Sequence, residues 1–572
     1  MEKQYRVANK KKTERLYKKA ENIAELLEVY DSMGERIFFA WKENDELKEI
    51  SYANFAEKVR NTAKGFVEMY GDENKRIAVI GENSPYWVET YLAVLLSGNT
   101  IVPMDKELSP KEISKFLEYA DVSAIAFAPS FSETFAEYII NAKHPTVKCL
   151  IPFGGDMIKE SKKTKVVPLK DIEEIGRSSI RALPEDYDME RCCELLFTSG
   201  TTGSSKCVML CMRNIFSDVM SACESVIFVP DDVLVSVLPL HHTYELMCTL
   251  GASCYGAKIC ICQSLRYVMK AFKEFRPTAL ILVPLFVSTM YKRVLTEAKK
   301  AGKEKALLAA SKVTHILNFA KLDLSEMFFK DVKEAFGGRL EKIICGGAAL
   351  NPELICAFDS FGIGIYEGYG ITECSPLVAV TPYYKRKPGS VGRSVPCCEM
   401  RIDGEEIGES GFVTGEIQVK GDNVMLGYMN NDAANADAFT EDGWFRTGDV
   451  GYIDNDGYLF ITGRQKSVIV LNNGKNVFPE EIEEYMDKID EIEEAVVVGR
   501  EEDDTVKLVA IIFPASEKYP ELDEASLRGV IQSKINNLNK SLPSFKQIHK
   551  IEFRKTEFEK TTTRKIKRYL VK

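Results

Sequence analysis

The spacing of hydrophobic residues alternates between two periods along most of the chain. Short apolar runs at 76–81, 100–103 and 123–127 predict strands, and the longer segments 55–69 and 86–96 have the spacing of helices. Strands that alternate with helices predict a largely parallel sheet covered on both faces, which is an α/β fold of the doubly wound type. Sheets of this kind bind ligands at the carboxyl ends of their strands.

The pattern changes beyond Val391. Short strands separated by Gly, Asp and Asn turns, at 411–420 and 443–449, predict antiparallel β structure. One compact unit ends near residue 465, and 466–572 have the pattern of a small α+β domain. Within that domain we expect strands at 467–471, 494–498 and 508–513 and helices at 479–486 and 527–537.

Composition narrows the class of protein. A net charge of −10 over 572 residues argues against nucleic acid as the main partner. Fifteen cysteines occur without a secretory signal, so we expect reduced, mostly buried thiols and a cytoplasmic protein. No apolar run reaches the roughly 18 residues of a membrane span, and 279–290, which Pro284 interrupts, predict a buried strand that leads into a helix.

One loop is rich in hydroxyl groups and glycine and ends at Lys206. It lies between a predicted strand at 194–197 and a predicted helix at 213–224, and glycine backbone and hydroxyls there suit phosphate oxygens. A P-loop NTPase needs Gly before the lysine and Ser or Thr after it, but Ser205 and Cys207 occupy these positions. A flexible surface loop stays the alternative for this segment alone. Its candidate phosphate-binding residues are Thr198, Ser199, Gly200, Thr201, Thr202, Gly203 and Lys206.

Three further motifs follow predicted strands. The stretch 238–245 carries His241 and His242, 346–350 is Gly-Gly-Ala-Ala-Leu, and 363–373 combines glycines with an aromatic ring, a hydroxyl and a carboxylate. The histidine pair has no third ligand at helical spacing, which argues against a metal site. Each motif alone is compatible with a plain turn, but three of them at predicted strand ends indicate a ligand site.

Together these segments resemble the adenylate-forming acyl-CoA synthetase superfamily, with most likeness to long-chain fatty-acid–CoA ligases. The motifs that carry the resemblance occur in family order from about Ser51 to the C-terminus; they are TSGTTGSSK, LPLHHTYE, CGGAAL, GYGITE, WFRTGDVG, GRQKSVIVLNNGKNVFPEEIE and KTTTRKIKR. The resemblance implies a large N-terminal domain (1–465) of doubly wound sheets plus a distorted antiparallel β-barrel. A small mobile α+β domain (466–572) follows, with a hinge at Lys466.

The resemblance also implies the reaction and its substrates. A carboxylate attacks the α-phosphate of ATP to give acyl-AMP and pyrophosphate, and the thiol of CoA then displaces AMP. Mg²⁺ is held by Thr201 and Glu373, His242 lies beside the substrate carboxylate, and Lys565 bridges carboxylate and phosphate. The residues implied at the nucleotide are Gly346, Gly347, Ala348, Glu367, Gly368, Tyr369, Gly370, Thr372, Asp449 and Arg464. Rotation at Lys466 presents the loop around Gly474 for the second step.

Three positions depart from the family pattern. Ser205 replaces a usual proline, Cys207 a glycine, and Arg564 a glycine; the bulk of Cys207 puts the geometry of the phosphate loop in question. The acceptor, CoA or an acyl carrier protein, stays open, as do an aryl acid as substrate, the chain length, the oligomeric state and peripheral contact with a membrane. A nucleotide-binding protein without turnover is disfavoured because Lys206, Glu373 and Lys565 are intact.

Overall fold

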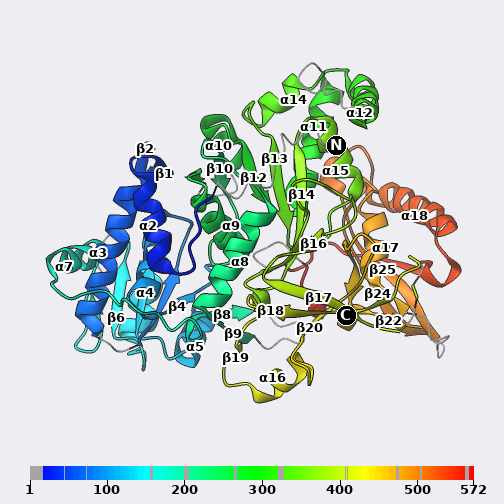
Figure 1. The fold of residues 1–572 in the computed structure, drawn as a ribbon. Coiled ribbons are helices and arrows are strands. Elements are labelled where there is room, and N and C mark those ends of the chain that lie inside the picture. The colour runs from blue at the N-terminus through cyan, green and yellow to red at the C-terminus, as the bar shows by residue number, and fades with distance from the viewer. Residues whose placement is uncertain are drawn as a thin grey trace. The chain divides into compact units, whose positions relative to one another are not determined.

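The computed structural model describes residues 17–43, 45–71, 74–154, 159–198, 205–262, 267–319, 328–405, 407–408, 410–471, 476–502, 505–560 and 566–571. By its internal contacts the chain divides into two compact units. The first consists of Met1–Gly200, Ser205–Glu399 and Lys420–Phe439, and the second of Thr201–Ser204, Met400–Val419 and Thr440–Lys572. Each unit is described by itself (Figure 1).

An eight-stranded sheet lies in the first unit. Its strands in spatial order are β19 (Gly427–Tyr428), β9 (Lys206–Cys211), β8 (Cys192–Thr198), β4 (Thr100–Pro103), β3 (Arg76–Ile80), β5 (Ala124–Phe127), β6 (Cys149–Pro152) and β7 (Lys165–Val166). The six strands from β8 to β7 are parallel, whereas β9 and β19 are antiparallel to their neighbours. The predicted parallel sheet is therefore confirmed.

A nine-stranded sheet completes the first unit. Its order is β16 (Arg393–Ser394), β15 (Leu377–Val380), β14 (Gly364–Gly370), β13 (Lys342–Gly346), β12 (Ala279–Leu282), β10 (Val233–Ser236), β11 (Lys258–Ile261), β1 (Ile37–Glu43) and β2 (Glu46–Ser51). Strands β14 to β1 are parallel, and β15, β16 and β2 are antiparallel. Both sheets are thus parallel in the middle and antiparallel only toward an edge.

Helices cover both faces of the sheets. They are α2 (Ile23–Met33), α3 (Tyr52–Tyr70), α4 (Pro85–Leu96), α5 (Pro110–Tyr119), α6 (Ser132–Phe135), α7 (Leu169–Ser178), α8 (Met212–Ser225), α9 (Thr243–Cys254), α10 (Val268–Phe275), α11 (Pro284–Lys300), α12 (Glu304–Phe319), α14 (Lys330–Ala335), α15 (Pro352–Ser360) and α16 (Asp432–Ala438). Capping residues mark where helices begin. At α5, Ser109 and Glu112 form a capping box, and Pro110 occupies the first turn of the helix. No helix in the described part of the chain is long and apolar enough to cross a membrane.

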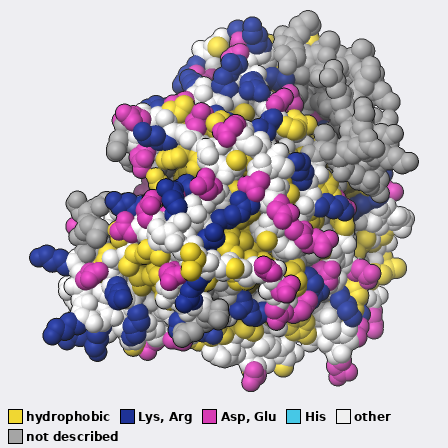
Figure 2. All heavy atoms as spheres, turned by 60° about the vertical axis from the view of Figure 1, so that its left-hand side comes forward, with side chains coloured by type: hydrophobic (Ala, Val, Ile, Leu, Met, Phe, Trp, Pro, Cys, Tyr) yellow, Lys and Arg dark blue, Asp and Glu magenta, His cyan; other side chains and the backbone are white. Residues whose placement is uncertain are grey.

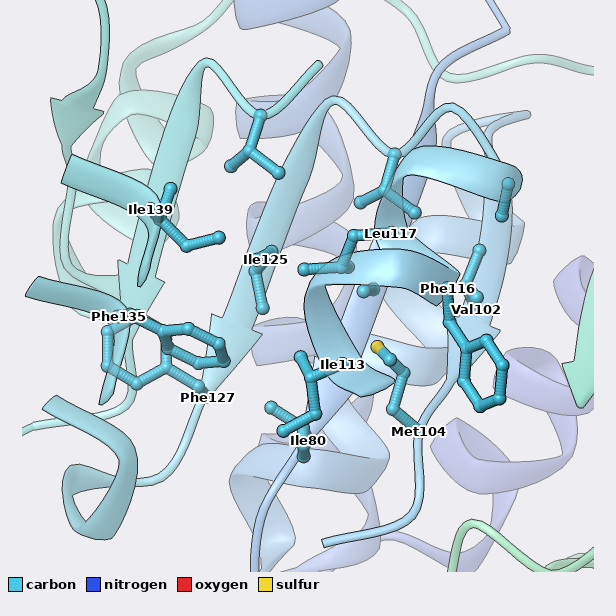
Figure 3. Close-up of a cluster of buried hydrophobic side chains, with 14 of the residues drawn as sticks. Ile80, Val102, Met104, Ile113, Phe116, Leu117, Ile125, Phe127, Phe135 and Ile139 are labelled. Atoms are coloured by element: carbon cyan, nitrogen blue, oxygen red, sulfur yellow. The ribbon is translucent and has the colours of Figure 1, made fainter. Parts of the chain in front are cut away.

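The core beside the eight-stranded sheet shows why its strands are apolar throughout. Ile113, Phe116 and Leu117 of α5 face Ile80 and Val102 of the sheet, and other helices lie behind the strands (Figure 3). Because strand residues alternate between faces, a strand covered on both sides needs a continuous apolar run.

On the face shown in Figure 2, cationic and anionic side chains are interspersed, so the net negative charge is not gathered there.

The antiparallel region and the C-terminal part follow. A four-stranded sheet, β17 (Cys398–Asp403), β18 (Thr414–Gly421), β20 (Phe445–Ile453) and β21 (Leu459–Arg464), forms where we expected a distorted barrel. The α+β part has β22 (Ile469–Val470) paired with β23 (Asn476–Val477), a sheet of β24 (Ile492–Glu502), β25 (Thr505–Pro514) and β26 (Lys550–Phe553), and helices α17 (Pro479–Met486) and α18 (Glu524–Ser541). The predicted helix at 479–486 has the same bounds as α17.

Two local predictions were wrong. We expected the phosphate loop to run from a strand into a helix, but it joins β8 to β9, and α8 begins only after β9. We also placed the 363–373 motif after a strand, whereas Glu367 to Gly370 belong to β14 itself and only Thr372 and Glu373 follow it. Backbone pairing with neighbouring strands, which the local pattern does not reveal, extends both strands.

Candidate functional site

Lys206 and Thr198 face each other at the end of a hairpin. The two residues are paired across β8 and β9, and the Thr198 hydroxyl lies 3.5 Å from the Lys206 carbonyl. β8 runs parallel to β4, so this end is the carboxyl end of a parallel strand, where such sheets bind ligands. Five predicted loop residues lie outside the described residues: Ser199, Gly200, Thr201, Thr202 and Gly203.

Cys207 does not crowd this hairpin end. Its side chain is 1% exposed and belongs to the hydrophobic core beneath the sheet, and its backbone carbonyl accepts a hydrogen bond from the Met429 amide at 2.8 Å. Burial raises the pKa of the Cys207 thiol to about 12. The extra bulk relative to glycine is therefore absorbed by the core, and the thiol is a poor nucleophile.

Tyr428, which the sequence analysis missed, connects two of the predicted site residues. Its hydroxyl donates a hydrogen bond to Glu373 Oε1 at 2.9 Å, and Lys206 Nζ lies 4.3 Å from the centre of its ring. Burial raises the pKa of Tyr428 well above its usual range, and the neighbouring Glu373 adds to the rise. The phenol is thus a neutral donor between a cation and an anion.

The predicted metal residues fit a cation that is bound mainly by its nucleotide. Among the described residues, no three His, Cys, Asp or Glu side chains lie close enough together to hold a metal ion. Mg²⁺ typically uses one or two carboxylates together with phosphates and water. Glu373 is a half-buried carboxylate close to Lys206, which suits that mode; Thr201, its predicted partner, lies outside the described residues.

An apolar cavity of about 80 Å³, partly open to solvent, lies beside the predicted nucleotide residues. Elements α8, α9, β13, β14 and β15 supply most of its wall. The described residues that line it carry no formal charge; they are Ala222, Cys223, Val226, Phe228, Tyr244, Met247, Cys248, Gly251, Ile344, Gly346, Gly347, Gly368, Tyr369, Gly370, Pro376, Leu377 and Val380. The cavity therefore suits an uncharged, apolar group.

Glycines shape one wall of this cavity. Gly346 of β13 and Gly368 of β14 are paired, and a Cβ on Gly346 would lie 3.1 Å from the Gly368 carbonyl and 3.4 Å from the Tyr244 ring. Gly347 has φ +90°, a conformation that side chains rarely adopt. Bare backbone here leaves room for a flat group. Ala348 beside them is exposed.

The remaining predicted residues of β14 and its turn lie along the same strand end. Tyr369 lines the cavity with Gly370, whereas Glu367 is buried one strand position away from Gly368. Thr372 and Glu373 are half-buried in the short turn that follows. The structure thus brings Tyr369, Thr372 and Glu373 together at one sheet edge.

His242 ends the loop between β10 and α9 and directly precedes the helix. Its ring lies 4.4 Å from that of His241, and His241 Nε2 is 3.5 Å from Asp105 Oδ1. The resemblance implied His242, but the contact of His241 with Asp105 could not be predicted because these two residues are far apart in the chain. The histidine pair is thereby held at the strand end beside the cavity residue Tyr244.

Glu245 lies under the same helix start. It is completely buried, and burial raises the pKa of its carboxyl to about 8, against a smaller opposing effect of the nearby Ser236 hydroxyl and Leu238 backbone. The Asn83 side chain holds Ser236 and Leu238 in place, because its amide nitrogen donates to the Ser236 hydroxyl at 3.1 Å and to the Leu238 carbonyl at 2.6 Å. The carboxyl is therefore mostly protonated at neutral pH.

The second unit contains two of the residues predicted at the nucleotide. Asp449 and Arg464 are paired across β20 and β21, and Arg464 Nε lies 2.9 Å from Asp449 Oδ1. Asp449 is nearly buried whereas Arg464 is half-exposed. A carboxylate held this way can accept hydrogen bonds from vicinal hydroxyls.

Helix α17 of the second unit anchors the C-terminal tail. Arg568 contacts Glu483 and lies 3.7 Å from Glu480, both on α17. Burial raises the pKa of Glu483 to about 7, although Arg568 lowers it. Lys560 and Ile566 pair as an antiparallel bridge. Lys565 and Gly474 lie outside the described residues.

Lys466 follows β21 in a short 3₁₀ turn at Gln465–Ser467 and is exposed. Gly463, just before it, packs tightly: a Cβ there would lie 2.7 Å from the Phe478 ring. Because the side chain of Lys466 is exposed, a hinge at this position would depend on its backbone. The hinge stays a prediction.

Comparison with protein families covers both parts of the chain. Residues 29–429 match the model described as "AMP-binding enzyme", and residues 466–571 match "AMP-binding enzyme C-terminal domain". The chain is 31% identical over 504 residues to long-chain-fatty-acid–CoA ligase 6 of Mus musculus. That alignment covers 82% of this chain and 70% of the relative.

Solved structures show the same fold. The adenylation domain of a carboxylate reductase from Mycobacterium chelonae superimposes with a TM-score of 0.80 at 20% identity, covering 97% of this chain and 90% of that one. The o-succinylbenzoate CoA synthetase from Bacillus subtilis, solved with an acyl-adenylate, gives a TM-score of 0.70 at 20% identity, covering 96% and 97%.

Proposed function

The chain belongs to the AMP-binding enzyme family, and on that premise we propose that it is an acid–thiol ligase that makes fatty acyl-CoA from a fatty acid, ATP and CoA. The named relative, a long-chain-fatty-acid–CoA ligase, supports this choice of substrate class. The acid we propose is of medium to long chain length. We place the protein in the cytoplasm, in keeping with its free thiols, all buried except Cys192, Cys356 and Cys397.

The single observation that carries the proposal is the uncharged cavity that shares a wall with the predicted nucleotide site. Gly346, Gly368 and Tyr369 belong to both. An acid bound with its apolar tail in the cavity has its carboxylate near the strand end that carries Thr372 and Glu373. Because the wall offers no cation to a second carboxylate, the cavity supports a monocarboxylic acid with an apolar tail.

In the first half-reaction the acid's carboxylate oxygen attacks the α-phosphorus of ATP, and the bond to pyrophosphate breaks. The chain's work in this step is to position the reactants and neutralise charge. Lys206 and the 198–206 loop bind the outer phosphates, Asp449 with Arg464 binds the ribose, and His242 with Lys565 orients the carboxylate. Mg²⁺, held by Glu373 and Thr201, supplies charge neutralisation of the phosphates when bound.

In the second half-reaction the CoA thiol attacks the acyl carbon of acyl-AMP, and AMP leaves. We assign residues 466–572 to a domain that turns about Lys466 between the two steps. The turn withdraws Lys565 and brings the loop around Gly474 to the thiol. Rotation of one domain then lets a single site serve two reactions in sequence.

A substrate panel tests the proposal. Pyrophosphate release is measured with ATP, Mg²⁺ and a series of acids from hexanoic to octadecanoic, together with benzoic and malonic acid, with and without CoA. The proposal expects release with the alkyl acids and acyl-CoA as product. Preference for benzoic acid would favour an aryl-acid ligase, and turnover only with an acyl carrier protein would favour a carrier-protein ligase. Release with malonic acid alone, or with none of the acids, would overturn it.

A further inference from the structure

Tyr428 contacts both charged residues that the proposed function assigns to the phosphates and the cation. Its hydroxyl donates to Glu373 Oε1 at 2.9 Å, and its ring lies 4.3 Å from Lys206 Nζ. Both residues are described in the structure, and they contact the same side chain without lying within ion-pair distance of each other. A cation over an aromatic face and a carboxylate at a phenol hydroxyl are both favourable arrangements.

The backbone of Tyr428 is fixed from two sides. β19 pairs with β9, so that Tyr428 lies opposite Val208, two positions from Lys206. The Asn435 side chain accepts from the Tyr428 amide at 2.6 Å and donates to its carbonyl at 2.9 Å. These contacts do not depend on a ligand, so the ring is held in place before any nucleotide binds.

The segment that carries Tyr428 also holds the Glu373 turn. The Met425 amide donates to the Glu373 carbonyl at 2.9 Å, and the Ser375 hydroxyl donates to the Asn423 carbonyl at 2.9 Å. The turn and β9 are therefore both attached to the stretch from Asn423 to Met429. Lys206 and Glu373 are positioned relative to each other by a segment at least fifty residues from either of them.

We infer that Tyr428 is a positioning residue that keeps Lys206 and Glu373 from pairing with each other and so preserves both charges for magnesium–ATP. This inference rests on the proposed function. Without the ring, a lysine and a glutamate this close would attract strongly in a half-buried site and neutralise each other. Lys206 would then be less available to phosphate, and Glu373 less available to the cation.

Binding of ATP without an acid substrate, measured by calorimetry, tests the inference apart from turnover. Tyr428→Phe keeps the ring but loses the hydroxyl; we expect the Kd of magnesium–ATP to rise at least about fivefold, and that of ATP in EDTA to change by less than about twofold. Tyr428→Leu removes both contacts, so both Kd values should rise at least about fivefold. Tyr119→Phe is the control, since its hydroxyl donates to the adjacent Met429 carbonyl at 2.6 Å.

The double variant Tyr428→Leu with Glu373→Gln tests the inference by the direction in which the Kd of metal-free ATP changes. If the two charges pair once the ring is gone, removing the carboxylate frees Lys206, and metal-free ATP should bind more tightly than to Tyr428→Leu alone. Unchanged or weaker binding in the double variant, or magnesium–ATP binding of Tyr428→Phe within about twofold of wild type, would overturn the inference. Wild-type ATP binding by Lys206→Ala and Glu373→Gln would instead overturn the proposed nucleotide site itself.

Discussion

Arg464 Nε lies 2.9 Å from Asp449 Oδ1 across two neighbouring antiparallel strands. The arginine orients a carboxylate that is itself nearly buried, so that its remaining lone pairs point in fixed directions. A carboxylate fixed in this way binds two adjacent hydroxyl groups better than a freely rotating one.

Replacing this carboxylate should weaken nucleotide binding selectively. We expect Asp449→Asn to raise the KM for ATP by about tenfold or more, because a hydrogen bond to a charged group is lost, with little change in the KM for the acid. Asp442→Asn is a matched control, since Asp442 pairs with Arg401 at the surface of the same part of the chain. Equal effects of both changes would assign Asp449 a structural role.

Gly251 offers a test of the cavity as the acyl site. A Cβ there would meet Cys223 Sγ at 3.7 Å, an ordinary contact, so Gly251→Ala should be tolerated. Gly251→Leu should fill the cavity further and lower kcat/KM for hexadecanoic acid at least about tenfold relative to octanoic acid. A parallel loss with both acids would show that the tail lies elsewhere.

Lys565 should matter for the first half-reaction alone. Its charge neutralises the reacting carboxylate and phosphate, so Lys565→Ala should greatly slow acyl-AMP formation while supplied acyl-AMP still reacts with CoA. Lys567→Ala, which changes the same residue type two positions on, is expected to be nearly neutral. Single-turnover measurement of each half-reaction decides, and equal loss in both would contradict the assignment.

Lys466 should matter for the second half-reaction. Proline fixes φ and removes the N–H, so Lys466→Pro should hold the domain in one arrangement. We expect adenylation to persist and CoA-dependent consumption of acyl-AMP to slow by at least about tenfold, or roughly 1.4 kcal/mol in barrier. Lys466→Ala keeps a flexible backbone and should behave like wild type. Parallel loss of both steps in the proline variant would mean a damaged fold, and loss of neither would place the pivot elsewhere.

The raised pKa of Glu245 predicts how the free energy of unfolding depends on pH. Its pKa is raised to about 8 in the folded chain from a usual value near 4.5, so its contribution to stability is fully present below about pH 4.5 and is lost as pH rises toward and through 8. Glu245→Gln removes this loss, and its melting temperature relative to wild type should rise between pH 6 and 9. Glu118→Gln, at an exposed site, should show no such trend. A constant difference across this range would contradict the prediction.

Helices and strands could be predicted from the sequence where the hydrophobic residues follow a single spacing, either that of a helix or that of a strand. Strand β4 at Thr100–Pro103 and helix α17 at Pro479–Met486 have the predicted bounds. Strand β9 was missed because its apolar run follows a polar loop and precedes a helix, so only pairing with β8 identifies it. Of the site, Tyr369, Glu373 and Asp449 were predicted from what the family resemblance of their motifs implies, and their roles stay predictions.

Residues that join the site through distant pairing were not found. Tyr428 reaches Lys206 and Glu373 through the two-residue strand β19, which no periodicity reveals. Asp105 reaches His241 from another loop of the first unit. Nor could the cavity be predicted, because five separate elements contribute its wall.

Helix α17 connects two parts of the chain that are far apart in the sequence. It begins soon after residue 475, and Arg568 from the tail rests on Glu483 and Glu480. The start of α17 and Arg568 are therefore held close together in the second unit. Under the proposed function, a movement of α17 carries Arg568 with it, and removing the contacts of Arg568 with Glu480 and Glu483 should therefore change the rate of one half-reaction relative to the other.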